Sequence, residues 1–170
     1  MNFSELELED YIYKNPHVLG MREWIGRQIK LPMGRLDLFG VHEQGMLFVV
    51  ELKVIGFNYS NIAQLNRYAR ALEDIAANNC YAPPRINKML VTQMSNISAV
   101  DLYDIEASDV YLLTYKATIG EIKFEHWGYT CDWKRQYDDR CNVMSDFVKK
   151  YLSLIYDNQP DWFKEGRTPE

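Results

Sequence analysis

Apolar and polar residues alternate along three successive runs in the first third of the chain. The runs span residues 24–31, 34–38 and 48–53, and Pro32 ends the first of them. Alternation with a period of two is typical of strands that bury one face. Residues 42–45 have the polar, glycine-containing composition of a hairpin connection between the second and third runs. The pattern therefore predicts three consecutive strands.

The polar positions of these strands carry two acids and a lysine. Because successive side chains point to opposite faces, Glu51 and Lys53 share one face of the third strand, and Asp37 likewise points away from its apolar neighbours. The apolar positions are Leu36, Leu38, Phe48, Val50 and Leu52. Charged groups beside such apolar runs are costly to bury unless a partner compensates them, and a divalent cation is such a partner.

Helical spacing predicts a helix on each side of these strands in the sequence. Ser4 and Glu7 have the spacing of a capping box, which begins a helix over residues 4–15. One face of this helix consists of Glu5, Leu8, Glu9 and Ile12. The second helix begins at Asn58 or Ser60 and runs to about Ala77. Its inward stripe consists of Ile62, Leu65, Tyr68, Ala69 and Leu72.

The rest of the chain predicts shorter elements. They are a strand at residues 89–92, a helix at 97–106, strands at 110–115 and 121–126, and a helix at 142–156. This order predicts an α/β fold with a mixed β-sheet flanked by helices. We expect a single domain over residues 1–157 and a loose tail over residues 158–170.

Composition and charge narrow the class of protein. With 170 residues, 47% hydrophobic and 25% charged, the chain can form a core and is too apolar for disorder. We expect no membrane span and no signal peptide, because no run of 18 apolar residues occurs and the N-terminus is acidic. Three cysteines, an odd number, favour reduced thiols and a cytoplasmic location. The net charge of −5 does not exclude nucleic acid, because affinity depends on the local patch.

Several motifs resemble a known superfamily of nucleases. Asp37, followed on the next strand by Glu51-Leu52-Lys53, resembles the metal-site motif of the PD-(D/E)XK superfamily, with Leu36 in place of the proline. The longer strings resemble the nuclease domain of archaeal and bacterial mismatch and single-strand-junction endonucleases, over about residues 4–75. These strings are Arg27-Gln28, Leu31-Pro32-Met33-Gly34-Arg35-Leu36-Asp37-Leu38 and Val49-Val50-Glu51-Leu52-Lys53.

This resemblance implies a restriction-endonuclease-like fold with an αβββαβ core and metal-dependent hydrolysis of phosphodiester bonds in DNA. Asp37, Glu51 and the backbone carbonyl of Leu52 would hold Mg²⁺ or Mn²⁺. Glu5 and Glu9 fall where such enzymes often place a helical glutamate, so either is a candidate further ligand. An endonuclease is favoured over an exonuclease. A homodimer is expected because cutting both strands needs two sites.

Four further residues receive roles in the same mechanism. Lys53 would orient the water and offset phosphate charge. Gln64 and Tyr68 are similar to the Gln-x-x-x-Tyr motif of recombination exonucleases in the superfamily. Gln64 would hydrogen-bond near the metal or the scissile phosphate, and Arg35 and Tyr68 are the candidate nucleic-acid contacts.

Each candidate also has a structural interpretation. A lone Glu-x-Lys occurs by chance about once in a chain of this size, so only its conjunction with Asp37 and Gln-x-x-x-Tyr favours a site. Glu5 and Glu9 could be solvated acids of a first helical turn. Tyr68 could belong only to the core, and Arg35 could form an ion pair.

Three wider questions also stay open. Residues 123–140 interleave aromatic and cationic side chains, which suits either base stacking or a dimer surface. The chain as a whole could instead be a non-catalytic nucleic-acid-binding or protein-interaction module that retains the nuclease fold. A third reading is an enzyme that acts on RNA or on a nucleotide.

Overall fold

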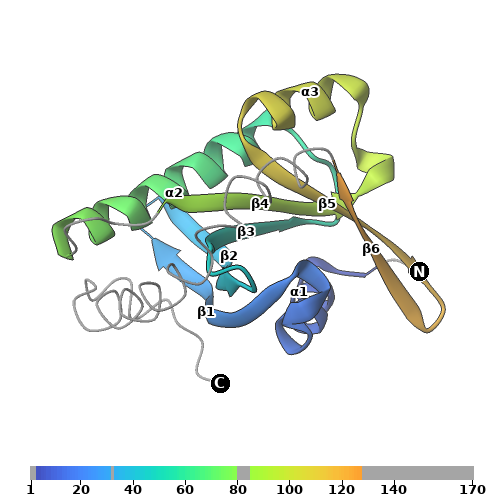
Figure 1. Cartoon of the computed structure of the whole chain (residues 1–170). Coiled ribbons are helices and arrows are strands. Elements are labelled where there is room, and N and C mark those ends of the chain that lie inside the picture. Colours follow the sequence, from blue (N-terminus) through green and yellow to red (C-terminus); the bar gives the residue numbers. More distant parts are fainter. Residues whose placement is uncertain (1–2, 32, 80–84, 128–170) are drawn as a thin grey trace.

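A six-stranded sheet forms the centre of the computed structural model, which describes residues 3–31, 33–79 and 85–127 (Figure 1). The strands, in chain order and in spatial order, are β1 (Met21–Leu31), β2 (Gly34–His42), β3 (Leu47–Lys53), β4 (Ile86–Gln93), β5 (Val110–Thr118) and β6 (Glu121–Trp127). The helices are α1 (Glu5–Lys14), η1 (Pro16–Leu19), α2 (Tyr59–Asn79), η2 (Met94–Asn96) and α3 (Ala99–Ala107).

The sheet is mixed, as the sequence predicts. β1, β2 and β3 pair antiparallel, β3, β4 and β5 pair parallel, and β6 returns antiparallel to β5. The parallel pairs need crossover connections, and α2 and α3 supply them. The order α1-β1-β2-β3-α2-β4 is the expected αβββαβ core, so the predicted fold class is confirmed.

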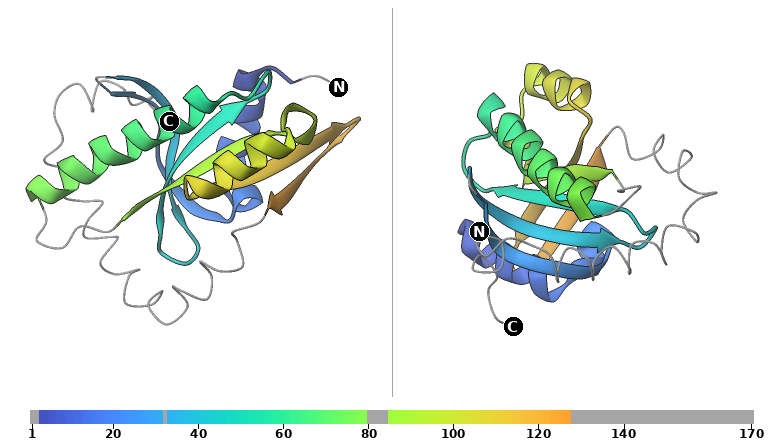
Figure 2. Two further views of the ribbon diagram at one scale, coloured as in Figure 1. Left: turned by 90° about the horizontal axis from the view of Figure 1, so that it is seen from above. Right: turned by 90° about the vertical axis from the view of Figure 1, so that its left-hand side faces the viewer.

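The helices divide between the two faces of the sheet (Figures 1 and 2). One apolar core contains the inward stripe of α2, Ile105 of α3 and the facing strand residues. The other core contains Leu8 and Ile12 of α1. β3 lies in the middle of the sheet and is covered on both faces, so all its residues except Lys53 are buried.

The predicted helix starts are confirmed by their hydrogen bonds. At α1, Ser4 Oγ accepts from Glu7 N at 3.2 Å, and Glu7 Oε2 accepts from Ser4 N at 2.8 Å. At α2, Asn58 Oδ1 accepts from Ser60 N at 2.9 Å, which identifies Asn58 as the capping residue. Local sequence therefore determines where both helices begin.

Several strands are longer than the sequence pattern indicates. β1 begins at Met21, and β4 spans Ile86–Gln93. In β4 the added residues include Asn87 and Lys88, which interrupt the apolar run. Asn87 Nδ2 donates to Leu47 O at 3.3 Å, so a polar side chain is accommodated within the paired strand. The backbone of β4 therefore stays paired beyond the run of apolar residues from which the strand was predicted.

Some predictions fall outside the described residues. They are the helix at 142–156, the tail at 158–170 and most of the aromatic segment 123–140. These predictions and the single-domain boundary therefore stay predictions. Within the described ranges, no helix combines the length and the apolar content that crossing a membrane requires.

Candidate active site

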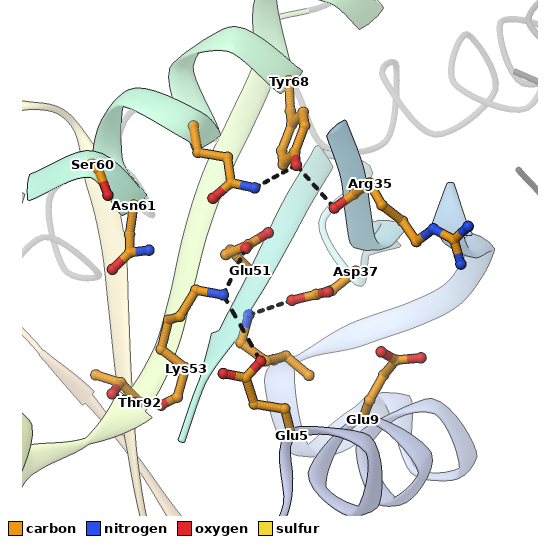
Figure 3. A network of polar contacts seen from close by, with 12 residues as sticks. Glu5, Glu9, Arg35, Asp37, Glu51, Lys53, Ser60, Asn61, Tyr68 and Thr92 are labelled. Atoms are coloured by element: carbon orange, nitrogen blue, oxygen red, sulfur yellow. Dashed lines mark hydrogen bonds and ion pairs between the residues drawn. The ribbon is translucent and has the colours of Figure 1, made fainter. Parts of the chain in front are cut away.

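Asp37 and Glu51 meet where β2 and β3 separate (Figure 3). The antiparallel ladder runs from Val41↔Leu47 to Leu38↔Val50. One position further along β2, the carboxylate of Asp37 accepts a hydrogen bond from the backbone N–H of Leu52 at 2.8 Å. The Asp37 side chain thus takes the place of a backbone acceptor, which turns its carboxylate towards the end of β3.

Glu51 is an acid in the centre of the sheet. Its surface is only 2% exposed, because β3 has a strand on each side. Glu51 Oε1 lies 3.0 Å from Lys53 Nζ. In the described part of the chain, Glu51 Oε2 is buried without a hydrogen-bond partner. A buried carboxylate oxygen with no partner is costly in a protein interior and is therefore a candidate ligand atom.

Lys53 lies on the same face of β3 and completes this group. Its Nζ contacts Glu51 and also lies 3.9 Å from Glu5 Oε2 on α1. Burial, the largest single effect, lowers the pKa of Lys53, but the carboxyl groups of Glu51, Glu5 and Asp37 together outweigh it, so the pKa is raised. The lysine is therefore held as an ammonium group beside the two acids.

The two acids shift each other's protonation. Burial, and next the nearby Asp37, raise the pKa of Glu51 to about 8. Burial also raises the pKa of Asp37 to about 6, although the hydrogen bond from Leu52 N–H and the charge of Lys53 oppose this shift. Both acids therefore hold protons more tightly than in water, and a cation between them would favour their charged forms.

Glu9 and Gln28 extend the site towards α1. Glu9 is 3% exposed and accepts from Arg27 Nε at 2.8 Å. The side-chain amide of Gln28 donates to Glu9 and, at 3.4 Å, to Asp37 Oδ1. Glu9 is therefore a buried acid linked to Asp37 through Gln28, and the alternative of a solvated acid does not hold for it. Glu5, by contrast, has a half-exposed side chain beside Lys53.

Sequence reasoning gave Gln28 no role. Its backbone has φ of +49°, a left-handed conformation that is rare for non-glycine residues in a strand. By the register of β1 and β2, Gln28 lies opposite Asp37, between the pairs Arg27↔Leu38 and Ile29↔Leu36. The proximity of Gln28 to Asp37 follows from the register of β1 against β2, and this register cannot be read from a single sequence.

Gln64, Tyr68 and Arg35 form a second cluster on the α2 side. Tyr68 Oη donates to Arg35 O at 2.9 Å and accepts from Gln64 Nε2 at 2.5 Å. Tyr68 is 0% exposed, which favours its core interpretation and disfavours a direct contact with nucleic acid. The side chain of Arg35 extends away from Glu51 (Figure 3), so the structure does not bring its guanidinium into the acid cluster.

The donor atoms at this site fit a hard divalent cation. Asp37 and Glu51 provide carboxylate oxygens, one of them without a partner. In a strand the N–H and C=O of one residue point to the same side, so the Leu52 carbonyl faces β2 as its N–H does. The described residues contain no group of three or more acidic, histidine or cysteine side chains arranged as a metal site. Mg²⁺ is commonly bound by two carboxylates together with a backbone oxygen and water molecules.

A mixed sheet flanked by helices, with two acids and a lysine near the ends of adjacent strands, places the chain in the class of α/β domains. Within that class, the chain belongs to the family described as Endonuclease NucS C-terminal domain, which matches residues 4–106. The resemblance to the nuclease domain of mismatch and single-strand-junction endonucleases is in keeping with this membership. No curated protein matches the chain.

Two solved structures share the fold. A repair endonuclease from Pyrococcus abyssi has 23% identity and a TM-score of 0.53, over 66% of this chain and 46% of that one. The protein of an EndoMS–dsDNA complex has 20% identity and a TM-score of 0.52, over 64% of this chain and 43% of that one. The match therefore covers less than half the length of those proteins.

Proposed function

We propose that this chain is a Mg²⁺- or Mn²⁺-dependent deoxyribonuclease of the PD-(D/E)XK superfamily that cuts DNA endonucleolytically. The observation that carries the proposal is the pair of the partly buried Asp37 and the buried Glu51, with a Glu51 oxygen that has no partner among the described residues and the ammonium group of Lys53 alongside. A binding module gains nothing from a desolvated acid pair, because each buried charge lowers its stability.

The residues divide the chemistry between them. Asp37, Glu51 and the Leu52 carbonyl would hold the cation, which when bound lowers the pKa of water and offsets charge on the phosphate. Lys53 would orient the attacking water and stabilise negative charge that develops on the phosphate. Gln64 would donate a hydrogen bond near the scissile phosphate. Glu9 or Glu5 would bind the cation as a further ligand or position the first two acids.

DNA is the proposed substrate because the family and the similar structures are named for endonucleases, and one of those structures is a complex with double-stranded DNA. We further propose a cytoplasmic protein that acts as a homodimer, since cutting both strands needs two sites. Equilibrium sedimentation that gives only a monomer under assay conditions would remove the dimer from the proposal.

The decisive variant is Glu51→Ala. It is expected to abolish cleavage and to weaken Mn²⁺ binding by about 100-fold or more, because it removes a ligand and one of two charges. Titration calorimetry with Mn²⁺ and cleavage of labelled DNA measure the two effects. Glu106→Ala, which removes an exposed acid on α3, is the matched control and should behave as wild type. Full activity of Glu51→Ala would rule out the mechanism.

A substrate panel separates this proposal from its rivals. Single-stranded, duplex, branched and mismatched DNA and RNA are each incubated with Mg²⁺ or Mn²⁺. Cation-dependent cleavage of DNA supports the proposal. Cleavage of RNA alone would show that the enzyme is a ribonuclease. Binding without cleavage of any substrate would favour a non-catalytic module that retains the fold.

A further inference from the structure

A hollow of about 490 Å³ lies between α2 and the start of β4, apart from the acid cluster. Its lining comes from α2, from β4 and from Arg85, the residue before β4 (Figure 1). The lining residues are Asn66, Arg67, Ala69, Arg70, Glu73, Arg85, Ile86 and Lys88. We call this hollow the α2–β4 basic pocket, because four of its residues are cationic.

The charge of the pocket is opposite to that of the chain. Its cations are Arg67, Arg70, Arg85 and Lys88, against one acid, whereas the chain as a whole carries −5. The acid, Glu73, already accepts a hydrogen bond from Ile86 N–H at 3.1 Å.

Few of these cations have an acidic partner. Arg85 is paired with Asp109 at 3.4 Å, and both side chains are more than half exposed. Among the described residues, no ion pair is formed by Arg67, Arg70 or Lys88. Four cations against Glu73 in the lining and Asp109 beside Arg85 leave the pocket with a net positive charge.

Lys88 is the most constrained of the four cations. Its Nζ donates to Asn66 Oδ1 at 2.7 Å and to Ser108 O at 2.9 Å, which are both neutral acceptors. An ammonium group has three donors, and these two bonds leave one for a further acceptor. Burial is the main effect that lowers the pKa of Lys88; Asp109 and Glu73 oppose it, and Arg85 adds to it. An anion in the pocket would favour the charged ammonium form.

The position of the pocket relative to the acid cluster follows from the sheet register. Lys88 pairs with Val49, and Leu90 pairs with Glu51, so the pocket and the acids lie on the same face of the sheet. α2 packs on this face between them. Four polar residues of α2 follow one another at intervals of three positions, and each is rotated by about 60° around the helix axis from the one before. They are Gln64, Arg67, Arg70 and Glu73. They form a path across α2 to the pocket from Gln64, whose partner Tyr68 has its pKa raised by burial and also by the charges of the nearby Glu51 and Asp37.

We propose that the α2–β4 basic pocket, with Arg67 and Arg70 at its edge, binds backbone phosphates of the DNA that enters the acid cluster. This inference rests on the proposed function, because it identifies where the rest of the substrate lies. The binding is independent of sequence, since it is made by cations to phosphates.

The test compares two double variants of equal charge change. Arg67→Gln/Arg70→Gln removes two cations of the pocket, and Lys116→Gln/Lys123→Gln removes two from the β5–β6 hairpin. Fluorescence anisotropy measures binding of labelled duplex and single-stranded DNA in EDTA, over a salt series. We expect the pocket variant to bind at least about 10-fold more weakly, with the salt slope reduced by about two. The hairpin variant should stay within about twofold of wild type.

The outcomes separate this inference from the proposed function. If wild type binds and cuts DNA but the two double variants behave alike, the pocket inference is overturned and the nuclease proposal stands. If wild type binds DNA through the pocket but cuts nothing with Mg²⁺ or Mn²⁺, the pocket inference stands and the nuclease proposal fails. Binding of inorganic phosphate in the pocket, without any loss of DNA affinity in the variant, would also overturn the inference.

Discussion

Glu51 carries its carboxylate on the central strand, where almost none of its surface reaches solvent. Lys53 neutralises one of its oxygens, the other has no hydrogen-bond partner among the described residues, and burial, and next the nearby Asp37, raise the pKa of the group. Asp37 is held by the Leu52 N–H and by Gln28. Asp37 is therefore fixed by groups of the two neighbouring strands, and Glu51 is paired with a lysine of its own strand. Such preorganisation is what a metal site needs.

The side-chain amide of Gln28 links Glu9 to Asp37. Gln28→Ala is expected to lower cleavage and Mn²⁺ affinity by about 10-fold or more, as the loss of a group that orients a ligand does. Gln28→Gly should lose as much activity, because it also lacks the amide. It should nevertheless be about 1 kcal/mol more stable to urea than Gln28→Ala, since glycine accepts a positive φ without strain.

This pair of variants separates the side chain from the backbone at position 28. If Gln28→Ala cleaves DNA as fast as wild type, the amide of Gln28 does not position Asp37. Equal stability of the alanine and glycine variants would argue against a strained backbone at this position.

At the scale of elements, one hydrogen bond connects α2 to the beginning of β2. Tyr68 Oη donates to the carbonyl of Arg35, two residues before Asp37. The ring also limits what Gly34 can be, because an added Cβ would lie 2.7 Å from Tyr68 Oη. The placement of the acid-bearing strand therefore depends on a tyrosine from the long helix.

Removing this hydroxyl tests which role Tyr68 has. Tyr68→Phe is expected to lower the free energy of unfolding by about 1–2 kcal/mol, because the Arg35 carbonyl loses its donor inside the protein. DNA affinity should stay within about twofold of wild type, since the ring is buried. Tyr103→Phe, at an exposed position of α3, is the control and should change neither quantity. A large loss of DNA affinity without a loss of stability would instead identify Tyr68 as a nucleic-acid contact.

At the scale of the whole molecule, the buried acids couple stability to pH. Their pKa values rise on folding, for Glu51 from 4.5 to about 8 and for Asp37 from 3.8 to about 6. Between these limits the folded protein binds more protons than the unfolded chain, so stability falls as pH rises. The contribution of this pair is greatest below about pH 4 and is lost as pH rises through about 6 for Asp37 and about 8 for Glu51.

Thermal unfolding in EDTA at pH 5, 6, 7 and 8 tests this coupling. The melting temperature of Glu51→Gln minus that of wild type is expected to grow with pH, because the variant has no charge to bury at this position. Taking the difference cancels groups that titrate equally in both proteins. Added Mn²⁺ should raise the wild-type melting temperature most at pH 8, where Asp37 is ionised and a larger share of Glu51 is ionised than at the lower pH values. A difference that does not change with pH would contradict the assigned pKa shifts.

The sequence by itself determined the elements and the residue types at the site. Alternation identified the strands that carry Asp37, Glu51 and Lys53, and capping residues identified where α1 and α2 begin. These signals are local, because they depend on which face of an element is buried and on hydrogen bonds between residues a few positions apart.

Only the tertiary structure decided which of these residues meet. Glu5 and Glu9 lie one helical turn apart with the same local pattern, and the packing of α1 buried Glu9 against Arg27 and Gln28 while Glu5 stayed half exposed. The register of β1 against β2 set Gln28 opposite Asp37. The α2–β4 basic pocket likewise joins residues from two elements. Such contacts depend on strand register and helix packing, which are set by the whole core rather than by neighbours in the sequence.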